Sequence, residues 1–155
     1  MLVYTSEPFD RAVTVAGPVS AEVWVRPSSQ HVDVHLRLCV VDVKGRSRNL
    51  SDGILRLEPG PDGTVTHPGA PSWGLVERGT DGTIRVRVRM WPTAVTYKIG
   101  QRIRLQVSAG AHPLFARNPG SGERLGEATT LVAVDQEVYR DAAHPSGIDL
   151  PISPI

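Results

Sequence analysis

The sequence has 155 residues, 40% of them hydrophobic, and its 17 Lys and Arg against 16 Asp and Glu give a net charge of +1. A chain of this length can bury about two-thirds of its unfolded surface in one core, so we expect a single domain over residues 1–155. The balanced charge argues against nucleic acid or an anionic membrane as partner, and the lone Cys39 excludes an internal disulfide.

The N-terminal residues, MLVYTSEPFDR, contain neither the basic region nor the apolar run of a signal peptide. No stretch of the chain reaches the ~18 consecutive apolar residues of a membrane span. We therefore expect a soluble, cytoplasmic protein without a membrane partner.

Apolar and polar residues alternate with period two in the first half of the chain, which predicts strands with one buried face. One run covers residues 19–26 and stops at a Pro-Ser-Ser sequence. A second covers residues 32–40, and a Lys-Gly turn at 44–45 leads to a further apolar run around 54–57. We expect the last two runs to form a hairpin.

The second half continues the pattern. Residues 84–90 and 102–107 alternate apolar side chains with Arg, and the run 129–138 predicts a final strand. Residues 59–82 form the longest irregular stretch and predict a surface loop. Apolar residues nowhere keep helical spacing for ten or more residues. Short strands separated by Gly and Pro predict an all-β fold, a β-sandwich or jelly roll.

The arginines of these strands would form a basic patch only if the two strands paired. Nearby acidic residues and the absence of interleaved aromatic side chains favour a solvated sheet face over a nucleic-acid site. The arginines concerned are Arg85, Arg87, Arg89, Arg102 and Arg104.

Ser108 lies in the pentad QVSAG, residues 106–110, which partly matches the Gly-x-Ser-x-Gly elbow of α/β-hydrolases. The first glycine is missing, and Pro113 follows where that elbow requires a helix. We interpret Ser108 as the end of a strand followed by a turn, not as a nucleophile.

A second motif, His31-x-Asp33-x-His35, would place three metal-binding residue types on one face of one strand. Side chains on one face of a strand lie ~7 Å apart and do not easily converge on one ion with ligand bonds of ~2 Å. A solvated polar face is the preferred interpretation, a metal site is a minor hypothesis, and no cofactor is expected.

Beyond single motifs, five sequence blocks resemble, in their residues and in their order along the chain, the C-terminal domain of the CocE/NonD hydrolase family. This family includes cocaine esterases, α-amino-acid ester hydrolases and X-Pro dipeptidyl-peptidases. Together they cover nearly the whole chain. The blocks are VYTSEPF, VAGPVSAEVWV, HVDVHLRLCVVDVKGRSRNLSDGILR, WPTAVTYKIGQRIRLQVSAGAHPLFARNPGSGE and AAHPSGIDLPI.

The resemblance implies a jelly-roll sandwich, similar to galactose-binding-like domains, that accompanies an α/β-hydrolase domain in the same polypeptide or as a separate chain. The family's catalytic triad belongs to that other domain, and none of its motifs matches this sequence. We therefore expect a non-catalytic domain that supports the hydrolase domain and the walls of its substrate cleft.

Aromatic and Arg side chains carry most of the energy of protein interfaces, and Asn118 lies in the Arg-Asn-Pro loop of the resemblance. The candidates for docking or ligand contact are Tyr4, Trp24, Trp73, Trp91, Phe115, Arg117 and Asn118.

Two alternatives remain open from the sequence. The sandwich would be an autonomous module for carbohydrates or other small ligands if exposed tryptophans such as Trp24 stack on sugar rings. It would be a small enzyme if His112, or the 31–35 motif, supplied an acid, a base or metal ligands. A domain separated from its partner would also expose an apolar patch, so we expect a tendency to form homo-oligomers.

Overall fold

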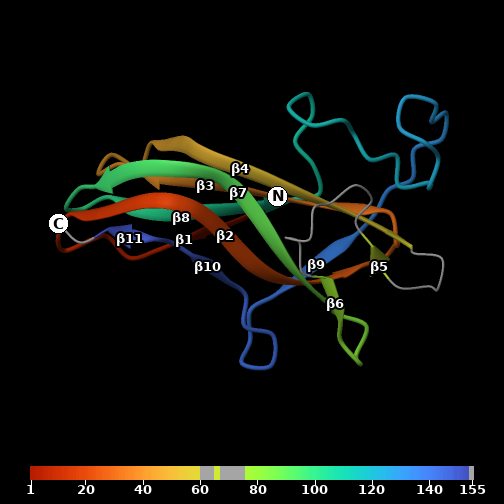
Figure 1. The fold of residues 1–155 in the computed structure, drawn as a ribbon, viewed down its shortest axis with the longest axis horizontal. Coiled ribbons are helices and arrows are strands. Elements are labelled where there is room, and N and C mark those ends of the chain that lie inside the picture. The colour runs from red at the N-terminus through yellow and green to blue at the C-terminus, as the bar shows by residue number, and fades with distance from the viewer. Residues whose placement is uncertain (60–64, 67–75, 154–155) are drawn as a thin grey trace.

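The structure is a computed structural model that describes residues 1–59, 65–66 and 76–153. Its described strands form two antiparallel sheets (Figure 1). The first sheet has the order β1 (Leu2–Thr5), β8 (Arg102–Ser108), β3 (Val32–Val41), β4 (Ser47–Pro59) and β5 (Val65–Thr66). The second has the order β10 (Gly147–Asp149), β2 (Val13–Pro27), β7 (Ile84–Tyr97) and β6 (Val76–Arg78), and β9 (Gln136–Tyr139) and β11 (Ile152–Ser153) also pair with β2.

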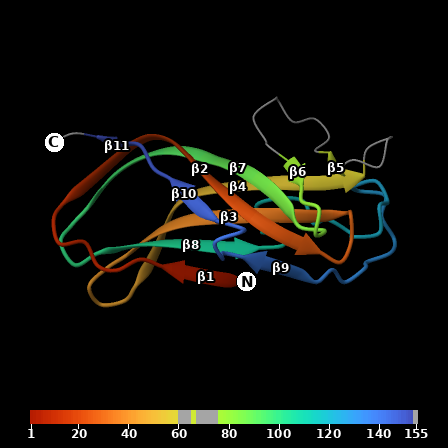
Figure 2. The ribbon, with the colours of Figure 1, turned by 90° about the horizontal axis from the view of Figure 1, so that it is seen from below.

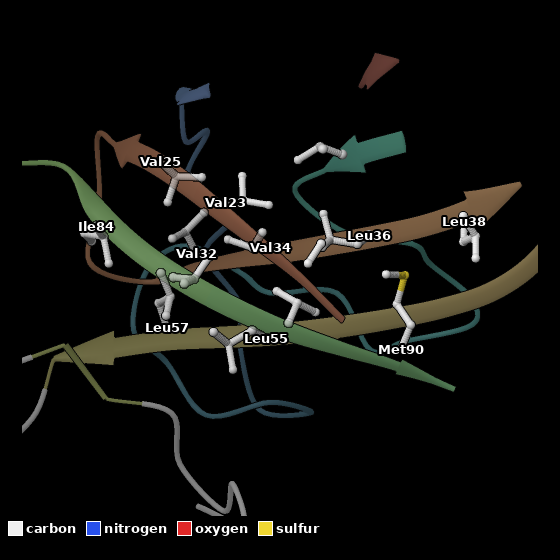
Figure 3. Close-up of a cluster of buried hydrophobic side chains, with 14 of the residues drawn as sticks. Val23, Val25, Val32, Val34, Leu36, Leu38, Leu55, Leu57, Ile84 and Met90 are labelled. Atoms are coloured by element: carbon white, nitrogen blue, oxygen red, sulfur yellow. The ribbon is translucent and has the colours of Figure 1, made fainter. Parts of the chain in front are cut away.

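The core lies between the two sheets and follows the alternation seen in the sequence. Along β2, every second residue from Val19 to Val25 is buried, and β7 repeats this from Ile84 to Met90. Figure 3 shows these side chains meeting those of β3 and β4. The predicted β-sandwich is therefore correct, and so is the predicted hairpin, because β3 pairs with β4 across the turn at residues 42–46. The described residues contain no helix long and apolar enough to cross a membrane.

The two sheets come close together where β4 crosses β7. A methyl group built on Gly53 would lie only 2.1 Å from the carbonyl oxygen of Arg89. Next to it, the buried hydroxyl of Ser51 donates a hydrogen bond of 2.5 Å to the carbonyl oxygen of Trp91. Glycine and a small hydroxyl residue thus let two backbones touch at this crossing.

The predicted strand over residues 129–138 is wrong for most of its length, since only β9 forms. The amide of Thr130 bonds the carboxylate of Glu123, and that of Val132 bonds the carbonyl of Pro119. These backbone amides already have hydrogen-bond acceptors within the loop, so they do not pair with a neighbouring strand. Of the expected loop 59–82, residues 65–66 and 76–78 form β5 and β6, and most of the remainder lies outside the described residues.

The arginine-bearing strands β7 and β8 belong to different sheets, so they do not combine into one basic patch. On β7, Arg85 and Arg87 both bind the carboxylate of Glu22 on the neighbouring β2. These side chains neutralise an acid within the sheet face instead of presenting free charge.

Candidate functional site

The segment 108–132 leaves the end of β8 and forms two loops at one end of the sandwich before the chain reaches β9. In Figure 1 these loops, teal and blue, extend from the end opposite to the C-terminus, and Figure 2 places them at the same end. Their inner side rests on the outer face of β3 and β4, where it forms two polar networks.

The first network centres on Asp33 of β3, whose side chain is 1% exposed. Arg56, opposite on β4, donates two hydrogen bonds of 2.7 and 2.6 Å to this carboxylate. Asn118 of the loop donates a third, of 2.9 Å, and its own side-chain oxygen accepts from the amide of Gly120. Arg56 also donates to the carbonyl of Ala116 at 2.8 Å, and its hydrogen bond to Asp33 raises the pKa of the guanidinium. A buried carboxylate thus fixes the loop at two points.

The second network centres on His35, which is 2% exposed. Its Nε2 lies 2.9 Å from the carboxylate of Asp52, and its Nδ1 lies 3.0 Å from the hydroxyl of Ser108. Arg37 donates to the same Asp52 oxygen at 2.6 Å, and the ring of Phe115 packs 5.8 Å from the imidazole. Burial lowers the pKa of His35 although Asp52 opposes the effect. The neutral ring therefore donates from Nε2 to Asp52, which can only accept, and the single hydroxyl proton of Ser108 is shared between Nδ1 and the carbonyl oxygen of Gly110.

Ser108, His35 and Asp52 are hydrogen-bonded in the order of a Ser-His-Asp triad, but their surroundings are those of a structural network. The imidazole has almost no contact with solvent and is covered by Phe115. The carboxylate that would orient it is shared with Arg37. Ser108 follows a strand and has the carbonyl of Gly110 as a second partner at 3.0 Å, so no strained elbow presents its oxygen to a substrate.

The expectation that Asp33 and His35 lie on a solvated face is wrong, because the loop buries both. His31 is half-buried, with its ring against Gly122 of the same loop. Across the described part of the chain, no three His, Cys, Asp or Glu side chains are placed to hold one metal ion. Asp33 binds Arg56 and Asn118, and His35 binds Ser108 and Asp52, so the motif stabilises the loop.

The outward side of the segment carries both charged and large apolar side chains. Its polar Asn118 and Ser108 point toward the sheet, whereas four large apolar side chains are 47 to 65% exposed. The four are Leu114, Leu125, Leu131 and Val132. We call them the loop patch. Arg117 of the same segment is exposed, and its side chain forms no hydrogen bond or ion pair with the residues that the structure describes. Beneath the loops, a hollow of about 360 Å³ is lined by Arg56, Asn118 and Arg124 among others.

The candidate contact residues from the sequence lie in several places. Phe115, Arg117 and Asn118 share the loop, but the first and third point inward, and His112 is exposed in the same loop.

The aromatic candidates outside the loop do not join that group. Tyr4 lies at the edge strand β1, and Trp91 on β7 is 70% exposed. Trp24 is half-buried on the outer face of the other sheet, where its ring packs edge-on against His144 at 5.1 Å. Trp73 lies outside the described residues.

The members of the loop patch were missed because an isolated Leu in an irregular segment carries no periodic signal. The run over residues 129–138 predicts a strand, which would bury one of Leu131 and Val132. The available signal is the presence of large apolar residues in a segment otherwise rich in Gly, Pro and charged residues.

Residues 1–149 match the family described as the X-Pro dipeptidyl-peptidase C-terminal non-catalytic domain. The chain belongs to this family. Cocaine esterase from Rhodococcus sp. (strain MB1 Bresler) is 33% identical over 98% of the chain, which corresponds to 25% of that protein.

Solved structures agree on the fold of this C-terminal domain. An aminopeptidase from the marine sediment archaeon Thaumarchaeota archaeon superposes with a TM-score of 0.78 at 24% identity, over 99% of this chain and 26% of that one. An α-amino acid ester hydrolase gives 0.76 at 20% identity, over 98% and 25%. The chain thus spans about a quarter of the length of the relatives it matches.

The resemblance to the CocE/NonD hydrolases is confirmed, and the chain is a non-catalytic C-terminal domain of that family. The alternative of an autonomous sugar-binding module is not favoured, since the domain accompanies a much larger remainder in these relatives.

Proposed function

We propose that this domain packs against an α/β-hydrolase domain through the loop patch and thereby fixes a wall of that domain's substrate cleft. The observation that carries the proposal is the exposure of four large apolar side chains within segment 108–132, while polar groups of the segment are held against the sheet. Soluble proteins rarely gather large exposed apolar side chains in one short segment unless another surface covers them.

The networks beneath the segment support the same role. Asp33 and His35 hold the loop backbone from the inside, so the outward side chains are presented by a rigid base. A surface that is ordered before it binds loses less conformational entropy on association. Arg117 adds a cation without an intramolecular partner among the described residues, and Arg is enriched at interfaces.

The chemistry of the whole protein follows from its relatives as part of this proposal. Their names record an esterase, an aminopeptidase and an amino acid ester hydrolase, which all transfer an acyl group to water. We assign this protein to hydrolysis of an ester or amide by a serine of the partner domain. The role of the C-terminal domain is positional, because catalytic groups need rigid surroundings.

The first test is the mass of the protein isolated from its native source. The domain alone has a mass of 16.8 kDa, and we expect either a several-fold larger polypeptide or a stable complex with a hydrolase chain. A native protein of 16.8 kDa that co-purifies with no hydrolase would contradict the proposal.

The second test maps the contact. The ¹⁵N-labelled domain is titrated with the cognate hydrolase domain, and amide signals from residues 108–132 should shift or broaden. The double variant Leu131→Ser/Val132→Ser should weaken binding at least about tenfold, because it removes two apolar side chains that the contact would bury. The control is Val43→Ser, which changes an apolar side chain that is 73% exposed in the β3–β4 turn. Equal binding by both variants would place the interface elsewhere.

A further inference from the structure

A cavity of about 290 Å³ opens between the edges of the two sheets and shares no residue with segment 108–132. It arises because the edge of β2 has two successive partners. β9 pairs with residues 24–27 of β2 and β10 with residues 20–22, while the chain between them, residues 140–146, leaves the sheet. β1 and β8 form the opposite wall. Figure 2 shows β1, β9 and β10 on this side of the sandwich.

The junction is held in a fixed shape by Ser146. Its hydroxyl donates to the carbonyl of Tyr139 at 2.5 Å and accepts from the amide of Trp24 at 2.9 Å. The backbone groups freed by the departing chain are therefore satisfied, and the opening is a built feature of the fold rather than a frayed edge.

The cavity wall is mostly apolar and continues the core of the sandwich. Its apolar members are Tyr4, Val23, Ile103, Leu105, Val107, Val138 and Ile148. This volume is at the lower end for ligand pockets and suits a group about the size of a substituted phenyl ring or a short alkyl chain. The few polar groups of the wall could not satisfy the hydroxyls of a sugar.

One cation stands at this apolar cavity without an acidic partner. The guanidinium of Arg140 lies 5.5 Å from the ring centre of Tyr4, and no carboxylate of the described residues forms an ion pair with it. The only acidic residue of the wall is Glu22, and Arg85 and Arg87 already bind both of its oxygens. The cavity therefore offers net attraction to an anion.

We propose that this cavity is a binding site for a small amphipathic carboxylate. The aryl or alkyl group would lie between the sheets against Leu105 and Val138, and the carboxylate would accept hydrogen bonds from Arg140. Arg and carboxylate form strong, geometrically specific pairs, which accounts for a selectivity that the apolar wall alone would lack. The site lies apart from the loop patch, and the inference does not depend on docking to a hydrolase.

The test is a titration of the ¹⁵N-labelled 155-residue chain with 4-phenylbutyrate, followed by amide chemical shifts. We expect saturable shifts at Tyr4, Val138 and Ile148, with a dissociation constant on the order of 1 mM for so small a ligand. The uncharged 4-phenylbutanamide should bind about tenfold more weakly. Shifts that do not saturate, or that map outside the cavity, would overturn the proposal.

Two variants separate the parts of the site. Arg140→Gln should weaken binding of the carboxylate about tenfold and leave binding of the amide unchanged, whereas the exposed control Arg48→Gln should change neither. Val138→Phe should fill the cavity and abolish both. If Val138→Phe does not fold, Arg140→Gln still decides, because it alters an exposed side chain. Equal affinity of Arg140→Gln and the parent chain for the carboxylate would refute the assignment.

Discussion

Two histidines of this domain have opposite electrostatic surroundings. Burial lowers the pKa of His35, although Asp52 beside it acts in the other direction. Hydrogen bonds that His144 donates to Asp141 and to Asp81 raise its pKa. Asp81 itself has a pKa lowered to about 2, chiefly by hydrogen bonds from Thr83. The two imidazoles therefore differ in charge over a range of pH near their common unperturbed pKa of about 6.5.

An NMR titration of the imidazole ¹⁵N shifts should show His35 protonating below pH 6.5 and His144 above it. The signs for stability are also opposite. Below pH 6.5 the unfolded chain binds a proton that buried His35 resists, so the His35 contribution to stability is lost as pH falls. The His144 contribution is fully present below pH 6.5 and is lost as pH rises through its folded pKa.

Substitution separates the two effects. In His144→Asn the loss of stability between pH 6.5 and the folded pKa of His144 should disappear, while the decline on the acidic side remains. A titration in which both rings protonate on the same side of pH 6.5 would contradict the described environment of one of them.

Among the elements, β4 and β7 of opposite sheets come into close backbone contact at Gly53. Gly53 leaves no room for a methyl group, since the carbonyl oxygen of Arg89 would lie 2.1 Å from it. The obstacle is backbone, which a rotamer change cannot move. Relief would require the two sheets to separate locally and would disturb the bond from Ser51 to Trp91.

Gly53→Ala should therefore lower the free energy of unfolding by about 3 kcal/mol, at the upper end for overpacking in a core. Urea denaturation followed by tryptophan fluorescence gives the measurement. The control is Gly147→Ala on β10, where an added methyl group meets nothing within 4 Å. It should change stability by less than about 1 kcal/mol. Similar midpoints for the two variants would show that the sheets are less tightly apposed than described.

The alternation of apolar and polar residues predicts residues 19–26 of β2, residues 84–90 of β7 and the β3–β4 hairpin, because burial of one sheet face is a local pattern. It could not predict that the other face of β3 is buried as well. Asp33 and His35 are covered by Asn118 and Phe115, which lie far along the chain. Contacts at such separation leave no periodic trace in either segment. The close crossing at Gly53 is equally invisible, since the residue across from it belongs to another sheet.

For the molecule as a whole, the distribution of exposed apolar side chains determines which surfaces can associate with other proteins. The segment that carries the loop patch lies at the end of the sandwich opposite to β11 (Figure 1). The wall of the cavity lies at the sheet edges instead. A domain studied without its partner leaves the loop patch in water, where it can bury itself only against another copy.

The isolated domain should therefore self-associate in a concentration-dependent way, which sedimentation velocity would detect. In Leu131→Ser/Val132→Ser the association should weaken at least about tenfold, because two apolar side chains no longer gain from burial. Val43→Ser, which removes an apolar side chain that is 73% exposed, should leave it unchanged. The cognate hydrolase domain should compete with self-association, since both would cover the same surface. A domain that stays monomeric at all concentrations, or dimers insensitive to the loop variant, would show that the loop patch is not a self-associating surface. Dimers that persist when the hydrolase domain binds would instead separate the two interfaces.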